Sequence, residues 1–126
     1  MAIDVERLYD RRAANRWDRT AIGDILERMT WIEPEKVAFV AAPSAITDPA
    51  FGELTYRQAD QLANQISNRL LEYGAQRADR VAMLCENSVE AALTKIGIAK
   101  AGGVAVPINP MMAHDVVTHM LRHVDA

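Results

Sequence analysis

Along the chain, apolar residues follow helical spacing in some segments and form alternating or continuous runs in others. Each segment of the first kind predicts a helix, and each of the second kind predicts a strand. One helical face of residues 22–29 carries the apolar side chains Ile22, Ile25, Leu26 and Met29. Pro34 is expected to end that helix. Two short apolar segments, 37–41 and 53–55, predict strands, because the segment between them contains the turn residues typical of a loop.

The longest helix is predicted between Thr55 and Gly74. Thr55 and Gln58 have the spacing of a capping box, in which each side chain binds a backbone amide at the start of the helix. Gly74 is expected to end the helix in the left-handed conformation that glycine adopts without strain. The side chains predicted to face inward are Ala59, Leu62, Ala63, Ile66 and Leu70.

Residues 80–108 predict a strand, a helix and a second strand. The run 80–85 is almost continuously apolar, which is typical of a strand in a sheet covered on both faces. The helix 88–101 is apolar nearly all round, so we expect it to be largely buried. A strand follows at 104–108, and the short connections favour a right-handed βαβ unit with parallel strands.

The two ends of the helix 88–101 carry residues that could bind a ligand or simply end the helix. Asn87 and Glu90 have capping-box spacing, and reciprocal capping is the preferred interpretation over ligand binding. Gly102 and Gly103 follow the helix C-terminus, where the helix dipole repels phosphate, so a structural cap is preferred there.

A last amphipathic helix is predicted near the end of the sequence, with the apolar face Val116, Val117, Met120, Leu121 and Val124. His119 and His123 lie four residues apart, a spacing at which two imidazoles can bind one metal. A zinc site needs three or four ligands, and no third is evident. We therefore interpret the pair as solvent-facing and predict no metal site.

Composition excludes several classes of protein. The chain has 126 residues, half of them hydrophobic and a quarter charged, which suits one globular domain. Its formal charge of −3 gives no general attraction to nucleic acid or anionic lipid. Residues 1–19 alternate basic and acidic side chains and predict a solvated arm or helix.

The sequence indicates a cytoplasmic protein. The single Cys85 permits no internal disulfide, and its apolar neighbours predict an inert, buried thiol. Asp4 and Glu6 stand where a secretory signal would be basic and then apolar. No uncharged apolar run reaches the ~18 residues that a membrane span needs.

Four short motifs together resemble one family. They are Leu-Thr-Tyr at 54–56, Asn-Ser-x-Glu at 87–90, Lys-Ala-Gly-Gly at 100–103 and Val-Pro-Ile-Asn-Pro at 106–110. In order and spacing these motifs resemble the early part of the adenylate-forming, AMP-binding ligases, and the last two favour the acyl-CoA synthetase branch. The resemblance implies an α/β fold, with residues 20–126 forming an incomplete N-terminal subdomain: a mixed sheet with a βαβ unit and packed helices.

The resemblance also implies an activity for a longer protein. Such a ligase activates a carboxylate, here expected to be a fatty acid, with ATP and Mg²⁺ to an acyl-adenylate, and transfers the acyl group to CoA. The family's Ser/Thr/Gly-rich phosphate loop and catalytic Lys have no counterpart within these 126 residues. We therefore assign no catalytic residue and expect the isolated chain to be inactive and to bind no cofactor by itself.

One possible cofactor contact is carried over from the family. Asn109, Pro110 and Met111 correspond to a turn that lines the pantetheine tunnel of CoA in relatives, some of which have glycines there.

The expected partner is the remainder of the ligase chain. We also expect self-association through an exposed sheet edge. Two alternatives stay open: a ligase that loads a carrier protein, and a non-catalytic oligomerisation or partner-binding module derived from this fold.

Overall fold

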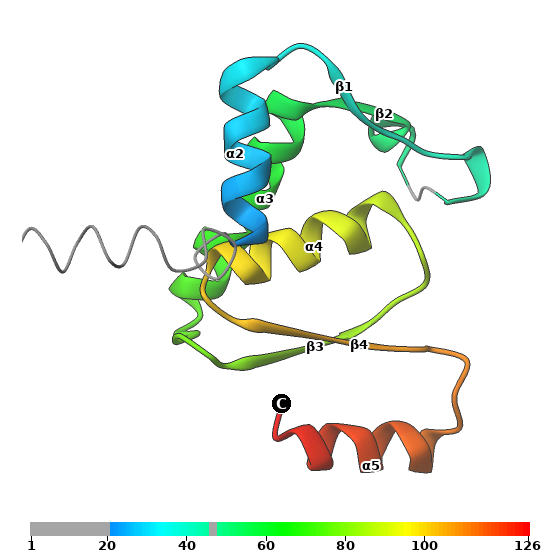
Figure 1. Cartoon of the computed structure of the whole chain (residues 1–126). Helices are drawn as coiled ribbons and strands as arrows, with labels where there is room; N and C mark the ends of the chain where they lie inside the picture. Colours follow the sequence, from blue (N-terminus) through cyan, green and yellow to red (C-terminus); the bar gives the residue numbers. More distant parts are fainter. Residues whose placement is uncertain (1–20, 46–47) are drawn as a thin grey trace, which may run out of the picture.

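A computed structural model describes residues 21–45 and 48–126, so the predicted arm at 1–19 lies outside the described residues. The first half of the described chain contains a helix, a strand pair and a long helix (Figure 1). In order these are α2 (Ile22–Ile32), β1 (Val37–Val40), two 3₁₀ turns (Pro43–Ala45 and Pro49–Phe51), β2 (Glu53–Thr55) and α3 (Tyr56–Glu72). The second half contains β3 (Arg80–Leu84), α4 (Val89–Lys100), β4 (Val104–Ile108) and α5 (His114–Val124).

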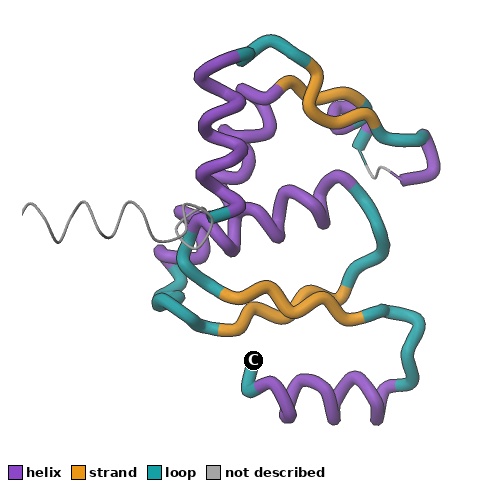
Figure 2. The backbone as a smooth tube through the Cα atoms, in the orientation of Figure 1, coloured by secondary structure: helices purple, strands orange, loops and turns teal. Residues whose placement is uncertain are grey.

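The strands form two separate pairs, and α4 lies between them (Figure 2). β1 and β2 are antiparallel, with an irregular register near Phe39. β3 and β4 are parallel and in register from Arg80 opposite Val104 to Leu84 opposite Ile108. The α/β class and the parallel βαβ unit are confirmed, while the expected mixed sheet is divided into two small sheets within the described part of the chain.

The core lies where α3 packs against α4. A close approach at Gly97 makes this packing possible, since a Cβ there would lie 2.6 Å from Cγ2 of Ile66. The predicted inward face of α3 is confirmed: Ala59 and Ala63 are fully buried, and the larger side chains of that face are half-buried. The main cluster of buried side chains consists of Leu26, Leu54, Ala59, Ala63, Val89 and Leu93.

The ends of α3 are those that the sequence predicts. The Thr55 hydroxyl accepts a hydrogen bond from the backbone N–H of Gln58 at 3.3 Å, and the Gln58 side chain accepts one from the N–H of Thr55 at 2.9 Å. Gly74 follows the last turn with φ of +93°, the left-handed region that favours glycine.

Two predictions of burial are wrong. Only one face of the β3–β4 pair is well covered, by α4, so that Met83 is buried while Leu84 is 58% exposed. On the predicted apolar face of α2, Leu26 is buried, but Ile22 and Ile25 are 62% and 52% exposed. Both elements thus keep apolar side chains that the rest of the described chain leaves largely exposed. α5 lies on the far side of the β3–β4 pair (Figure 1) and buries none of its own residues.

No helix in the described ranges is long and apolar enough to cross a membrane.

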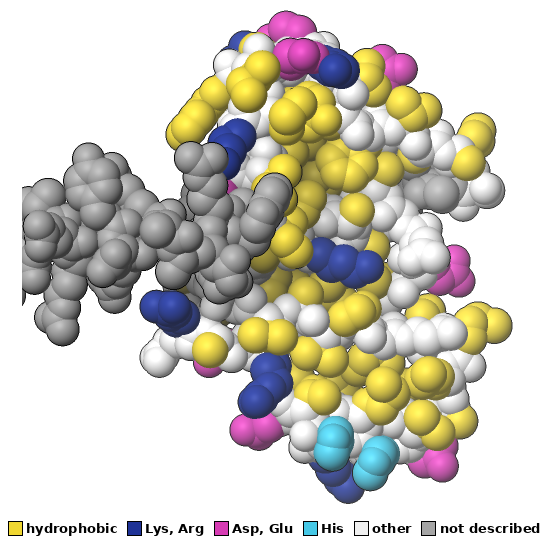
Figure 3. All heavy atoms as spheres, viewed as in Figure 1, with side chains coloured by type: hydrophobic (Ala, Val, Ile, Leu, Met, Phe, Trp, Pro, Cys, Tyr) yellow, Lys and Arg dark blue, Asp and Glu magenta, His cyan; other side chains and the backbone are white. Residues whose placement is uncertain are grey.

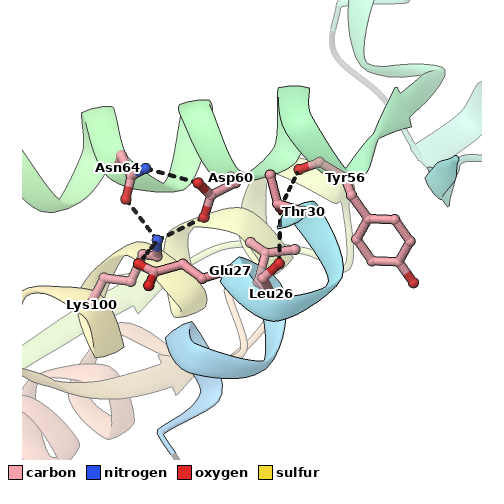
Figure 4. Close-up of polar contacts among 7 residues, drawn as sticks. All are labelled: Leu26, Glu27, Thr30, Tyr56, Asp60, Asn64 and Lys100. Atoms are coloured by element: carbon pink, nitrogen blue, oxygen red, sulfur yellow. Dashed lines mark hydrogen bonds and ion pairs between the residues drawn. The ribbon is translucent and has the colours of Figure 1, made fainter. Parts of the chain in front are cut away.

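A lysine joins the three core helices (Figure 4). The ammonium group of Lys100, at the end of α4, donates to Glu27 Oε1 of α2 and to Asp60 Oδ1 and Asn64 Oδ1 of α3, each at 2.7 Å. Its side chain is only 6% exposed. Gly23 of α2 leaves room for it, because a Cβ there would lie 2.7 Å from Lys100 Cγ. We call Lys100, Glu27, Asp60 and Asn64 the Lys100 cluster.

Charge in the Lys100 cluster favours the protonated amine. Burial alone would lower the pKa of Lys100, but hydrogen bonds to Asp60 and Glu27 outweigh burial and raise the pKa above the ordinary 10.5. The folded-state pKa therefore exceeds the unfolded one. The stabilisation by Lys100 is fully present below about 10.5 and is lost as the pH rises through the higher folded-state pKa.

Replacing this lysine should test how much the Lys100 cluster contributes to stability. Lys100→Met keeps the apolar stem but leaves Asp60, whose side chain is 15% exposed, without its cation. We expect the free energy of unfolding at neutral pH to fall by about 3 kcal/mol, measured by urea denaturation. The difference from the unsubstituted protein should shrink at pH values above the Lys100 pKa.

The matched control is Lys36→Met. The ion pair of Lys36 with Glu33, at 2.8 Å, is on the surface, with the lysine side chain 58% exposed. We expect no measurable loss of stability from this change. Equal losses for the two lysines would show that the Lys100 cluster does not stabilise the packing of the helices.

Candidate functional site at the carboxyl ends of β3 and β4

The parallel strands β3 and β4 end at the same edge, which brings the two turns that follow them together. Ligands of open α/β sheets bind outside the carboxyl ends of the strands, so this edge is the first place to examine. A cavity of about 420 Å³ lies between the turns. We call it the turn cavity, and it is lined by Cys85, Glu86, Asn87, Ala91, Lys95, Pro107, Ile108, Asn109, Pro110 and Met111.

The turn cavity therefore brings together the three residues predicted to contact the cofactor. Asn109 Oδ1 accepts a hydrogen bond from the backbone N–H of Met111 at 2.9 Å, which closes a tight turn around Pro110. The carbonyl of Asn109 also accepts a bond from the N–H of Met112 at 3.3 Å. Met111 is left 82% exposed, so its thioether side chain is available to pack on a ligand.

A second cavity, of about 510 Å³, lies beside the first. It is lined by residues 81–88 together with Ser44, Glu90, Ala91 and Thr94. The segment 85–87 and Ala91 line both cavities. This segment thus forms a shared wall at the beginning of α4.

The charges that line the two cavities do not favour phosphate. Glu86 and Glu90 place carboxylates near the N-terminus of α4, where the helix dipole would otherwise attract an anion. Lys95 is the single cation among the described residues that line either cavity. The turn cavity combines two prolines and one methionine with Glu86 and Lys95, whose charges are opposite.

The residue that caps α4 is Ser88, so the predicted capping box of Asn87 and Glu90 is wrong by one position. Ser88 has an extended backbone, with φ of −150° and ψ of 169°, and its hydroxyl accepts a hydrogen bond from the N–H of Ala91 at 3.1 Å. The helix therefore begins one residue later than the Asn-x-x-Glu pattern suggests. Asn87 is exposed and lines both cavities instead.

The other residues that the sequence singles out as candidates are Gly102, Cys85 and the pair His119 and His123. Gly102 has φ of +82°, which fits the predicted structural cap after α4. Cys85 is half-buried rather than buried, because it sits where β3 leaves the cover of α4. His119 and His123 are exposed and stacked, with ring centroids 6.0 Å apart. Within residues 21–45 and 48–126, no three His, Cys, Asp or Glu side chains form a group that could hold a metal ion.

The sequence pattern did not predict the role of Lys100 or the contribution of Lys95 to the turn cavity. Both residues are polar positions on a helix that is apolar nearly all round. The apolar helix around Lys100 did indicate a special role for this residue, because a lysine in a buried helix must contact carboxylates or reach solvent.

The start of α4 gives a direct test of the corrected cap. Ser88→Ala removes the hydroxyl that accepts from Ala91, and we expect the free energy of unfolding to fall by about 1 kcal/mol. Asn87→Ala is the matched control and should leave stability within experimental error. Thermal or urea denaturation followed by circular dichroism measures both, and a larger loss for Asn87→Ala would return the cap to the predicted position.

The curated relatives that this chain matches include fatty-acid–CoA ligases. The long-chain-fatty-acid–CoA ligase FadD13 of Mycobacterium tuberculosis is 36% identical over 100 residues, which are 79% of this chain and 19% of that ligase. A medium/long-chain-fatty-acid–CoA/3-oxocholest-4-en-26-oate–CoA ligase of the same organism is 31% identical over 88 residues, or 70% of this chain and 15% of that ligase. The chain thus spans less than a fifth of the length of these curated relatives.

The similarity extends to three dimensions. A solved Mycobacterium tuberculosis fatty acyl CoA synthetase superposes with a TM-score of 0.74 at 36% identity, over 84% of this chain and 20% of that one. The N-terminal domain of FACL13 from the same organism gives 0.73 at 34% identity, over 84% of this chain and 25% of that one. The AMP-binding enzyme family matches residues 10–126. The chain therefore belongs to the AMP-binding enzyme family, in the acyl-CoA synthetase branch of the adenylate-forming ligases.

Proposed function

We propose that this chain is the N-terminal portion of an acyl-CoA synthetase that activates a fatty acid with ATP and transfers it to CoA. The observation that carries the proposal is the superposition on a fatty acyl CoA synthetase over 84% of the chain at 36% identity. The curated relatives are several times longer, so most of the machinery of such an enzyme lies in segments that this chain does not match. A cytoplasmic location fits this activity and the single unpaired Cys85.

The described residues contribute framework rather than chemistry. Adenylation requires cations and backbone amides directed at phosphate and an acid that holds Mg²⁺. The cavities at the strand ends instead carry Glu86 and Glu90 and one lysine. We infer that this chain by itself forms no acyl-adenylate, and that ATP and Mg²⁺ bind mainly to the remainder of the ligase.

The turn cavity is proposed to border the path of the CoA pantetheine arm. That arm is uncharged and combines amides with short methylene segments. The turn at Asn109–Met111 offers a matching wall, since it presents a proline, an amide-bearing side chain held in place and an exposed methionine. Asn109 Oδ1 already accepts from Met111, so Met111 is the side chain that we expect to contact the arm.

The open reading frame around this chain and the intact mass of the expressed protein test the proposal. We expect the frame to continue into a Ser/Thr/Gly-rich loop that ends in Lys. The resulting protein should release pyrophosphate from ATP in the presence of a fatty acid and form acyl-CoA. The 126-residue chain should do neither. A stop codon directly after Ala126, with a natural product of 13.9 kDa, would overturn the ligase proposal and favour the binding-module alternative.

The CoA assignment predicts a separation of the two half-reactions in the complete ligase. Met111→Asp places a charge on the proposed pantetheine path, so we expect KM for CoA to rise roughly tenfold, equivalent to about 1.4 kcal/mol. Fatty-acid-dependent ATP–pyrophosphate exchange should be unchanged. Met112→Asp is the control, because Met112 is 41% exposed and does not line the turn cavity. Equal effects of both changes on CoA would refute the assignment.

A ligase that loads a carrier protein is the second candidate. Surfactin synthase subunit 3 of Bacillus subtilis is 35% identical over 68 residues, which are 54% of this chain and 5% of that protein. Against it, β4 is followed by Asn109, whereas peptide-synthetase adenylation domains tend to have Asp there. Comparing free CoA with a phosphopantetheinylated carrier protein as acceptor distinguishes the two, and we expect CoA to be the better acceptor.

A further inference from the structure

Besides the turn at Asn109–Met111, the turn cavity is lined by three regularly spaced residues at the start of α4. We call these three residues, Asn87, Ala91 and Lys95, the α4 wall. Ala91 and Lys95 lie four residues apart on α4 and therefore on the same face of the helix. Asn87 lies four residues before Ala91, immediately before the N-cap.

The α4 wall presents two hydrogen-bonding side chains with a small residue between them. Ser88 makes the cap of α4, so the exposed amide of Asn87 is not used in capping, and it can both donate and accept hydrogen bonds. Lys95 is also exposed, and its ammonium group has three donors and no acceptor. Ala91 has no side chain beyond Cβ, so it leaves space for a ligand to lie between the two polar groups.

The charges of the turn cavity favour a neutral polar group over a phosphate. Lys95 and Glu86 are the two charged side chains among the described residues that line it, and no ion pair joins them. A phosphate bound by Lys95 would share the cavity with the Glu86 carboxylate, which repels it. An amide has no net charge, so its carbonyl can accept from Lys95 without that repulsion.

The pantetheine arm of CoA has groups that match both sides of the turn cavity. It contains two secondary amides, each with one N–H and one C=O, joined by a short methylene segment. Asn87 and Lys95 can bind such amides, and the exposed Met111 of the turn after β4 can pack on the methylene groups. A few polar groups placed in a largely apolar cavity are what orients a ligand of this kind.

We propose that Asn87 and Lys95 are specificity-determining residues that hydrogen-bond the amides of the pantetheine arm from the α4 wall. This inference rests on the proposed ligase function and extends it, because it assigns polar contacts to residues outside the Asn109–Met111 turn. Lys95 donates to one amide carbonyl of the arm, and the Asn87 amide pairs with the other amide group.

The lysine contact is tested in the complete ligase with two acceptors. Lys95→Met keeps the length of the side chain and removes the donor, so we expect KM for CoA to rise roughly fivefold. Fatty-acid-dependent ATP–pyrophosphate exchange should be unchanged. With pantetheine as acceptor, which has the same arm and thiol but none of the phosphates of CoA, kcat/KM should fall by the same factor as with CoA.

The asparagine contact is tested in the same assays. We expect Asn87→Ala to raise KM for CoA by a similar factor and to leave the exchange reaction unchanged. Matched controls are Lys36→Met and Asn68→Ala, since both side chains are exposed and line neither the turn cavity nor the cavity beside it. Neither control should change KM for CoA.

Three results would overturn the inference while leaving the proposed function in place. The first is a working ligase whose KM for CoA is unchanged in both Lys95→Met and Asn87→Ala. The second is a loss with CoA that is absent with pantetheine, which would assign Lys95 to a phosphate of CoA. The third is an equal loss in the exchange reaction, which would show that these side chains support the ligase as a whole. An unsubstituted complete ligase that forms no acyl-CoA would instead overturn the proposed function together with this inference.

Discussion

The packing of this chain depends on the burial of one ammonium group among three helices. Besides the Lys100 cluster, the Thr30 hydroxyl of α2 donates a hydrogen bond to the carbonyl of Tyr56 in α3. Lys100, at the end of α4, binds residues of both α2 and α3. Space-filling atoms show how much apolar surface the helices still present to solvent (Figure 3). Hydrophobic contact alone is non-directional, so it leaves the positions of such helices weakly defined. A buried cation with three partners at 2.7 Å defines them, because other arrangements leave the charge unpaired.

A feature of this fold could be predicted from the sequence when the interaction that causes it joins residues only a few positions apart. The limits of α3 came from Thr55, Gln58 and Gly74, whose capping contacts span a few residues and are written directly in the sequence. The parallel βαβ unit came from apolar runs and a glycine pair in the same way. The cap of α4 was misplaced by one residue because Asn87 and Ser88 are both good capping residues and local pattern cannot choose between them.

What the sequence could not show was which apolar faces would be covered. Ile22 and Ile25 have helical spacing just as Leu26 does, yet only Leu26 meets α3 and the core. Periodicity identifies a face, whereas burial depends on a partner that the pattern does not name. The Lys100 cluster was hidden for the same reason, since its members are separated by up to 73 residues. For the candidate site, the family motif indicated Asn109–Met111, and only the parallel register of β3 and β4 showed that the segment 85–87 forms the facing wall.

The position of Lys100 in the chain also constrains the order in which the protein can assemble. α2 lies at the beginning of the described chain, and its ionic partner is made 73 residues later, whereas the contacts of Lys100 with α3 span 40 and 36 residues. Contacts over shorter separations close at lower entropic cost, so Lys100 should bind its partners in α3 before its partner in α2. During synthesis, none of the three partners can bind Lys100 until α4 is complete. Of the three, Glu27 is expected to bind last, because its contact closes the longest segment of the chain.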